Sequence, residues 1–95
     1  MNEIEARRIA LNFLRGREAV SGVKLALKDE ATEEHGFGWI FFYNSKEFIE
    51  TGSLSAALAG NSPIVVRRRD GMVLETGTAE PLSVYIGRLI DRGDL

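Results

Sequence analysis

The chain has 95 residues, of which 44% are hydrophobic and 27% are charged, as in a folded globular protein, and we expect one domain that spans residues 1–95. The formal net charge of −2 lacks the basic excess of nucleic-acid-binding domains, and no apolar run approaches the roughly 18 to 20 residues that span a membrane. The absence of Cys excludes disulfides, thiolate metal sites and Cys nucleophiles, so we expect no nucleic acid, membrane or thiolate-bound metal as a partner.

The first predicted element is a helix over residues 3–15. Asn2 is a suitable N-cap with Glu5 three positions later, and Gly16 is suited to a left-handed C-cap. Apolar residues recur at the i, i+3, i+4, i+7 spacing of a helix with one buried face. They are Ala6, Ile9, Ala10, Phe13 and Leu14. The acidic start of the chain differs from the basic start of a signal peptide, which favours the cytoplasm.

Two strands are predicted next. Residues 23–28 alternate apolar and polar side chains, as in a strand with one buried face. Residues 37–43 contain the only Trp, three of the five Phe and one of the two Tyr, with apolar side chains on both faces of a strand. Such a strand is typical of the middle of a sheet, with helices on one face and a loop, a second copy or a partner on the other. We predict that a hairpin joins the two strands.

The segment between these strands is acidic, and we place it at the tip of the hairpin. It carries four of the fourteen acidic residues of the chain, namely Asp29, Glu30, Glu33 and Glu34. Clustered carboxylates raise the association rate with a cationic partner, but a solvated loop whose charges prevent edge aggregation is the other interpretation. His35 is the only His and has no companion ligands at suitable spacing, so we predict no metal site.

The middle of the chain is less regular. Residues 46–52 are predicted as a short edge strand or an irregular crossing that Gly52 ends. Residues 53–61 have a Ser cap and a stop at Gly60, which predicts one or two helical turns laid over the sheet.

A second hairpin is predicted from residues 64–69 and 72–76. The Asp70-Gly71 pair between these apolar runs is the strongest short-range hairpin signal and predicts a type I′ turn. The first strand ends in three consecutive Arg residues, which point to alternate faces and so form no single anion site. We expect Arg68 to pair with Glu75 or with another acidic residue across the sheet.

The last predicted element is a helix with Pro81 at its first position. Its apolar stripe has helical spacing and consists of Leu82, Tyr85, Ile86, Leu89 and Ile90. The order of elements predicts an α+β fold, in which a four-stranded antiparallel sheet of two hairpins has the N-terminal and C-terminal helices packed on one face.

The residue patterns of enzymes are missing from the sequence. It has no Gly-rich phosphate loop, no His or Asp set with metal-ligand spacing, and no Ser with a matching His and acid. We therefore predict no catalytic residue, no cofactor and no metal, and the residues alone indicate a binding module.

Several short motifs occur in a fixed order along the chain. They are Gly38-Trp39 followed by Phe41-Phe42, Glu47–Gly52, Leu58–Val66, Asp70-Gly71, and Gly77–Leu82 with Tyr85. In this order they resemble the YrhB-like proteins, also called the immunity protein 35 family. The resemblance implies a small bacterial protein that binds the toxin domain of a polymorphic toxin system, often predicted to be a papain-like peptidase, and blocks it. It also implies a chaperone-like alternative.

Trp39 and Tyr43 are the predicted anchors for a toxin, because exposed Trp and Tyr dominate the binding energy of many interfaces. Core packing is the alternative for both side chains. In the rival functional class, a chaperone-like or homo-oligomeric module, the apolar face of the sheet contacts unfolded clients or a second copy in a weak homodimer.

Overall fold

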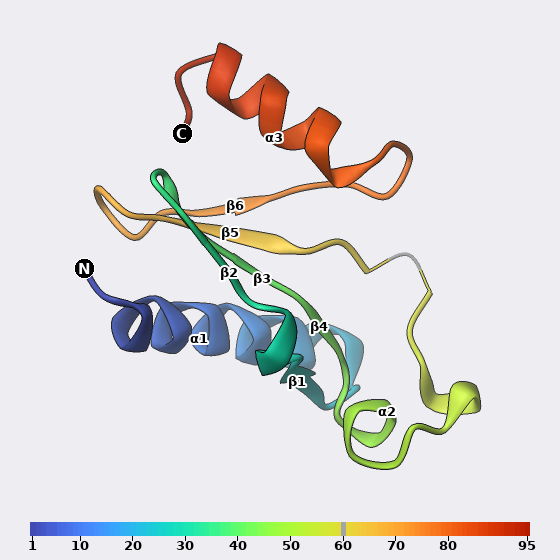
Figure 1. The fold of residues 1–95 in the computed structure, drawn as a ribbon. Coiled ribbons are helices and arrows are strands. Elements are labelled where there is room, and N and C mark those ends of the chain that lie inside the picture. Colours follow the sequence, from blue (N-terminus) through green and yellow to red (C-terminus); the bar gives the residue numbers. More distant parts are fainter. Residues whose placement is uncertain (60) are drawn as a thin grey trace.

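A computed structural model describes residues 1–59 and 61–95 and has an α+β architecture (Figure 1). The predicted stop at Gly60 lies outside the described residues. In chain order the elements are α1 (Glu3–Ser21), β1 (Leu25–Leu27), the 3₁₀ turn η1 (Asp29–Ala31), β2 (Glu33–His35), β3 (Gly38–Phe41), β4 (Tyr43–Ser45), α2 (Lys46–Thr51), the 3₁₀ turn η2 (Leu54–Ala56), β5 (Ile64–Arg67), β6 (Val73–Glu75) and α3 (Leu82–Asp91).

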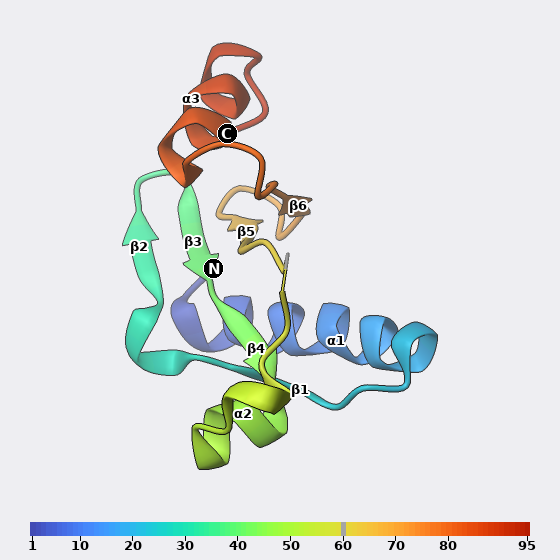
Figure 2. The same cartoon turned by 90° about the vertical axis from the view of Figure 1, so that its right-hand side faces the viewer.

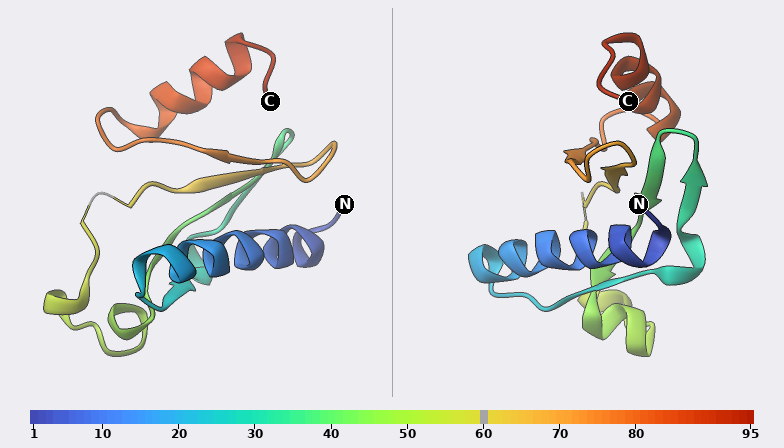
Figure 3. Two further views of the ribbon diagram at one scale, coloured as in Figure 1. Left: turned by 180° about the vertical axis from the view of Figure 1, so that it is seen from behind. Right: turned by 90° about the vertical axis from the view of Figure 1, so that its left-hand side faces the viewer.

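The helices α1 and α3 lie on opposite faces of an antiparallel sheet with the strand order β2-β3-β5-β6 (Figures 1 and 3). The α+β class and an antiparallel sheet of four strands agree with the sequence prediction, but the composition of the sheet does not. The predicted strand over residues 23–28 lies in a separate two-stranded sheet, as β1 beside β4, and β2 takes its place beside β3. The placement of both helices on one face was also wrong. The physical reason lies in β3 and β5, in which all four residues are buried. Two apolar faces each need a cover, and one helix is available for each.

The larger core lies between α1 and the sheet. Trp39 and Phe41 of β3 stand opposite Val66 and Ile64 of β5, and these four side chains face the helix. The α1 residues that meet them are Ala6, Ala10 and Leu14, all nearly inaccessible. Small Ala side chains let the helix axis approach the sheet, and each large side chain buried there contributes about 1.5–3 kcal/mol.

A smaller core lies between the sheet and α3. The cross-strand pair of Ile40 and Val65 is buried on this face, and Leu89 is the one α3 residue described as buried. Tyr85 packs on the loop before the helix, where a Cβ at Gly77 would lie 2.6 Å from the Tyr85 ring. The predicted helix is therefore present, but its apolar stripe is covered less completely than that of α1.

The N-terminal helix is longer than the sequence predicts. Its N-cap is confirmed, because the Asn2 side chain accepts a hydrogen bond from the Glu5 amide at 2.9 Å. Its predicted end at Gly16 was wrong, since α1 continues to Ser21 and Gly22 forms the left-handed C-cap with φ of 75°. A Gly inside a helix costs only about 1 kcal/mol, which the packing of α1 outweighs.

The first hairpin is present but interrupted. The predicted strand over residues 37–43 is split, with β2 pairing to β3 and β1 pairing to β4 in a separate two-stranded sheet. The turn η1 bulges out between the two pairings, and Arg7 of α1 holds it through hydrogen bonds of 2.9 and 3.0 Å to the Asp29 carboxylate. The reversal of the chain falls at Gly36 and Phe37, so the acidic segment is not at the tip.

The second hairpin, β5 with β6, is confirmed, but its turn is not of type I′. Gly71 has a φ of 74°, whereas no described residue other than Gly has a positive φ, so Asp70 does not. The loop is wider, closed by a hydrogen bond from the Arg67 amide to the Met72 carbonyl oxygen at 2.9 Å. Asp70 accepts hydrogen bonds from the Arg67 guanidinium and from the Met72 amide, which fixes this wider loop.

The segment predicted as an edge strand or irregular crossing is the helix α2. Ser45 caps it by accepting a hydrogen bond from the Phe48 amide at 3.1 Å, and Gly52 ends it with φ of 71°. The break at Gly52 is thus confirmed and the strand is not. The following turn η2 leaves Leu54 83% exposed, so this apolar side chain is not packed on the sheet as predicted.

Candidate protein-binding surfaces

The described part of the chain shows no cluster of metal-ligating side chains. Residues 1–59 and 61–95 contain no group of three or more His, Asp or Glu that could hold a metal ion. In the same residues, no helix is long and apolar enough to cross a membrane. The candidate sites in the described residues are therefore surfaces and cavities that could contact another macromolecule.

The titratable groups with altered pKa values belong to ion pairs. The hydrogen bond from the Arg7 guanidinium lowers the pKa of Asp29 below its ordinary range. Hydrogen bonds from the Arg67 guanidinium and from the Met72 amide likewise lower the pKa of Asp70. Both carboxylates are held in the charged form by a cation of the same chain, which is the behaviour of structural pairs.

The four acidic residues predicted for the tip do not form one patch. Asp29 and Glu30 lie on η1, whereas Glu33 and Glu34 lie on β2 and point to opposite faces of the sheet. The Glu34 carboxylate lies 3.0 Å from the Arg68 guanidinium on the face of α1, which confirms that Arg68 pairs with an acidic residue other than Glu75. Arg17 of α1 pairs with Glu75.

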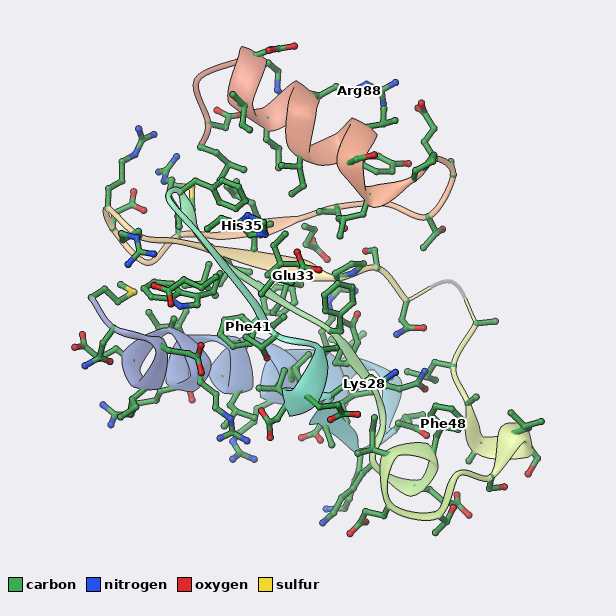
Figure 4. The ribbon with its side chains drawn as sticks, in the orientation of Figure 1. Lys28, Glu33, His35, Phe41, Phe48 and Arg88 are labelled. Atoms are coloured by element: carbon green, nitrogen blue, oxygen red, sulfur yellow. The ribbon has the colours of Figure 1, made fainter. Side chains whose placement is uncertain are left out.

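Glu33 lies on the face of α3. Its carboxylate contacts the His35 ring at 2.9 Å, and Figure 4 shows both side chains on the α3 side of the sheet, while Phe41 points toward α1. Arginines of the same chain engage Asp29 and Glu34, and the His35 ring contacts Glu33, so among the described contacts Glu30 is the one acidic side chain of the segment without such a partner. The charge available on this segment is smaller than its composition indicates.

Trp39 is a core residue in this structure. Its side chain is 1% exposed and packs among the residues that face α1, with the Arg68 guanidinium 4.3 Å from the ring centroid. Within the described residues its Nε1 atom has no hydrogen-bond acceptor. The packing alternative is therefore favoured for Trp39, which presents no surface to a partner.

Tyr43 is partly accessible. It stands on β4 opposite Leu27 and lines a cavity of about 180 Å³ at the C-terminal end of α1. The aliphatic walls of this cavity come from Val20, Val23, Leu25 and Leu58. Val20 is 90% exposed, so the cavity opens onto an apolar surface that could receive a side chain from a partner.

A larger groove lies between the β2–β3 hairpin and α3, and we call it the α3 groove. It has a volume of about 450 Å³, and its lining residues are Glu33, His35, Phe37, Ile40, Leu82, Ser83, Ile86, Gly87 and Ile90. The His35 and Phe37 rings stack with centroids 4.9 Å apart. The sequence analysis missed this site, since it placed the last helix on the other face of the sheet.

One sequence signal could have indicated the α3 groove. Residues 37–43 are apolar on both faces, which requires a second cover on the face away from the N-terminal helix.

The comparisons with known proteins agree with the motifs noted in the sequence. The family model described as immunity protein 35 matches residues 4–86, a range that runs from α1 through both hairpins into α3. The uncharacterized protein YrhB of Escherichia coli (strain K12) is 43% identical over 49 residues, which cover 52% of this chain and 52% of YrhB. The match thus spans about half the length of that relative. No solved structure matches the chain.

Proposed function

The chain belongs to the immunity protein 35 family, and from this premise we propose that it binds a cognate bacterial toxin domain and neutralises it by non-catalytic contact. The observation that carries the proposal is the family match over residues 4–86, which includes all strands of the four-stranded sheet. An inhibitor of this kind needs a complementary surface and no reacting group.

The finer parts of the proposal concern the toxin and its compartment. The family resemblance supports a papain-like peptidase as the toxin, and the immunity protein would meet it in the cytoplasm of the producing cell. We also propose that residues 1–95 act as one domain, because the core residues that face α1 come from both hairpins.

The proposed contact residues are those among the sequence candidates whose side chains are accessible. Glu30, Glu33 and Tyr43 could touch the toxin directly, whereas Asp29 and Glu34 would act through their pairs with Arg7 and Arg68. Trp39 is omitted because its side chain is buried.

The experiment that tests the proposal is co-expression with the toxin domain encoded by the adjacent gene. We expect growth to be restored and the two proteins to elute together as a one-to-one complex in size-exclusion chromatography. Persistent toxicity, with separate elution of the two proteins at micromolar concentration, would contradict the proposal.

A chaperone-like or homo-oligomeric module is the second candidate, and the α3 groove with its half-exposed Ile90 favours it. Exposed apolar grooves of this kind also receive unfolded chains. Suppression of the heat aggregation of citrate synthase by the purified protein, without any toxin complex, is the outcome that this candidate predicts.

A further inference from the structure

We propose that the α3 groove is the docking site for an extended segment of the toxin, and that this segment carries an apolar side chain next to a Lys or Arg. The inference rests on the proposed function, because it names where the toxin docks and which chemistry it presents. Three properties of the groove support it, namely its open strand edge, its apolar lining and its charge.

The strand that borders the groove is an open edge. In the order β2-β3-β5-β6, β2 has a neighbour on one side only, and Figure 2 shows it at the outer margin of the sheet. All three of its residues are exposed. An edge strand presents unpaired N–H and C=O groups, and an extended peptide can add to it as a further strand. At the hairpin end of β2 the Arg68 guanidinium already donates to the His35 carbonyl oxygen at 2.8 Å, so a peptide would pair with the part of β2 before that carbonyl.

The lining of the groove offers a place for an apolar side chain of that peptide. Ile40 is 2% exposed and belongs to the floor, while Ile90 on α3 is 50% exposed at the wall. The volume of about 450 Å³ falls within the range typical of ligand pockets. Backbone pairing along β2 would supply affinity, and the side chain held in the groove would supply selectivity.

The charge of the groove selects a cationic occupant. Glu33 lines it, and no Lys or Arg is among the described residues of the lining. The Glu33 carboxylate contacts the His35 ring at 2.9 Å and is about half exposed, at 49%, so it remains accessible to an incoming cation. A carboxylate at such a rim favours partners with Lys or Arg and disfavours acidic ones.

A second copy of this chain fits the groove less well than a basic segment. In a two-fold symmetric dimer the same patch lies on both sides of the interface, and the described lining of the groove contains Glu33 but no Lys or Arg. A second copy would therefore not bring a Lys or Arg of this lining to Glu33. The charge pattern therefore favours a different protein as the occupant.

The decisive variant is Gly87→Gln, compared with Gly16→Gln. Gly87 lines the groove and Gly16 lies in α1 away from it, and a Cβ at either position has no neighbour within 4 Å. Both substitutions exchange a helical Gly for a better helix former, so both proteins should fold. We expect Gly87→Gln to weaken binding of the purified toxin domain about tenfold or more, with Gly16→Gln within about twofold of the unmodified protein.

A second pair of variants tests the charge without filling the groove. Glu33→Lys places a cation in the lining, whereas Glu50→Lys makes the same charge change on the exposed surface of α2. We expect Glu33→Lys to reduce the association rate several-fold at low salt, because rim charges act mainly on that rate, and Glu50→Lys to change it little. Equal association rates for the two variants would show that the charge of Glu33 does not contribute to toxin binding.

The outcomes separate this inference from the proposed function. If the unmodified protein binds the toxin domain and Gly87→Gln binds it equally well, the groove inference is wrong and the immunity function stands. If the unmodified protein does not bind, both fail. If light scattering detects a dimer of the isolated chain that Gly87→Gln abolishes, the occupant is a second copy, and the assignment to the toxin is overturned.

Discussion

Gly38 is the residue whose lack of a side chain matters most to the sheet. It begins β3 with φ of 146°, and a Cβ there would lie 2.1 Å from the Val66 carbonyl oxygen and 2.9 Å from the Arg68 amide nitrogen. Both atoms belong to the backbone of the neighbouring β5 segment, so they cannot move aside as a flexible side chain would. Only Gly fits between the two hairpins at this point.

We expect Gly38→Ala to lower the free energy of unfolding by roughly 2 kcal/mol or more, because it combines backbone strain with a clash inside the sheet. Urea unfolding followed by the fluorescence of the single Trp measures the change. Gly36→Ala is the matched control, since a Cβ at Gly36 has no neighbour within 4 Å. Equal midpoints for the two variants would show that the close contact is absent in solution.

At the scale of the element, α1 holds Gly16 in its middle and ends at Gly22. We expect Gly16→Ala to raise the free energy of unfolding by about 0.5–1 kcal/mol, because Ala is the better residue inside a helix. Gly22→Ala should lower it, since Gly22 has a left-handed φ of 75°. Thermal unfolding measures both changes, and a loss of stability in Gly16→Ala would mean that the helix ends where its sequence first indicates.

Hydrophobic periodicity identified the two long helices, and the Asp-Gly pair identified the second hairpin, because amphipathic stripes and such a pair are strong local signals. Periodicity placed residues 23–28 in the main sheet, whereas β2 is the strand beside β3. It could not identify α2, since Lys46–Thr51 is too short to display a helical stripe and its Ser45 cap resembles a turn residue. Nor could it assign helices to faces of the sheet. That assignment depends on β3 pairing with β5, which are distant in the sequence.

The candidate sites could also be predicted only in part, because local patterns do not show which distant residues come together. The acidic segment and Tyr43 were visible in the sequence as local features, whereas the α3 groove combines residues near position 35 with others near position 86. The sequence did not show whether Trp39 is buried. A strand with apolar residues on both faces has the same sequence pattern whether its second face contacts a helix or a partner protein. In the structure Trp39 is buried, because α1 covers its face of the sheet.

At the scale of the whole molecule, Arg67 ties the second hairpin to the end of the chain. It is 8% exposed, it binds the Asp70 carboxylate, and it donates a hydrogen bond of 2.7 Å to the Asp94 carbonyl oxygen after α3. This buried guanidinium holds the last helix against the sheet at a place where few apolar contacts do so. Its charge is balanced mainly by ionised Asp70, with a smaller contribution from Asp94.

Acid should therefore destabilise the fold through Asp70 and Asp29. Both have pKa values below 3.8 in the folded protein, so the unfolded chain binds more protons as the pH falls through the ordinary Asp range. The stability that these pairs contribute is complete above that range and is lost on acidification toward the folded pKa values. Urea midpoints between neutral pH and pH of about 2.5 measure the loss. Asp70→Asn should flatten this dependence, and an unchanged slope would contradict the role of the pair.

The arrangement of α1 against both hairpins also has a consequence for biosynthesis. The helix is translated before any strand, yet the side chains that cover its apolar stripe include Ile64 and Val66 of β5. Leu27, Trp39 and Phe41 can cover part of the stripe earlier, but the rest of it stays uncovered until the ribosome has made the second hairpin. A protein with this topology completes its core late in its own synthesis, and an arrest of translation before β5 leaves a fragment whose apolar stripe is only partly covered.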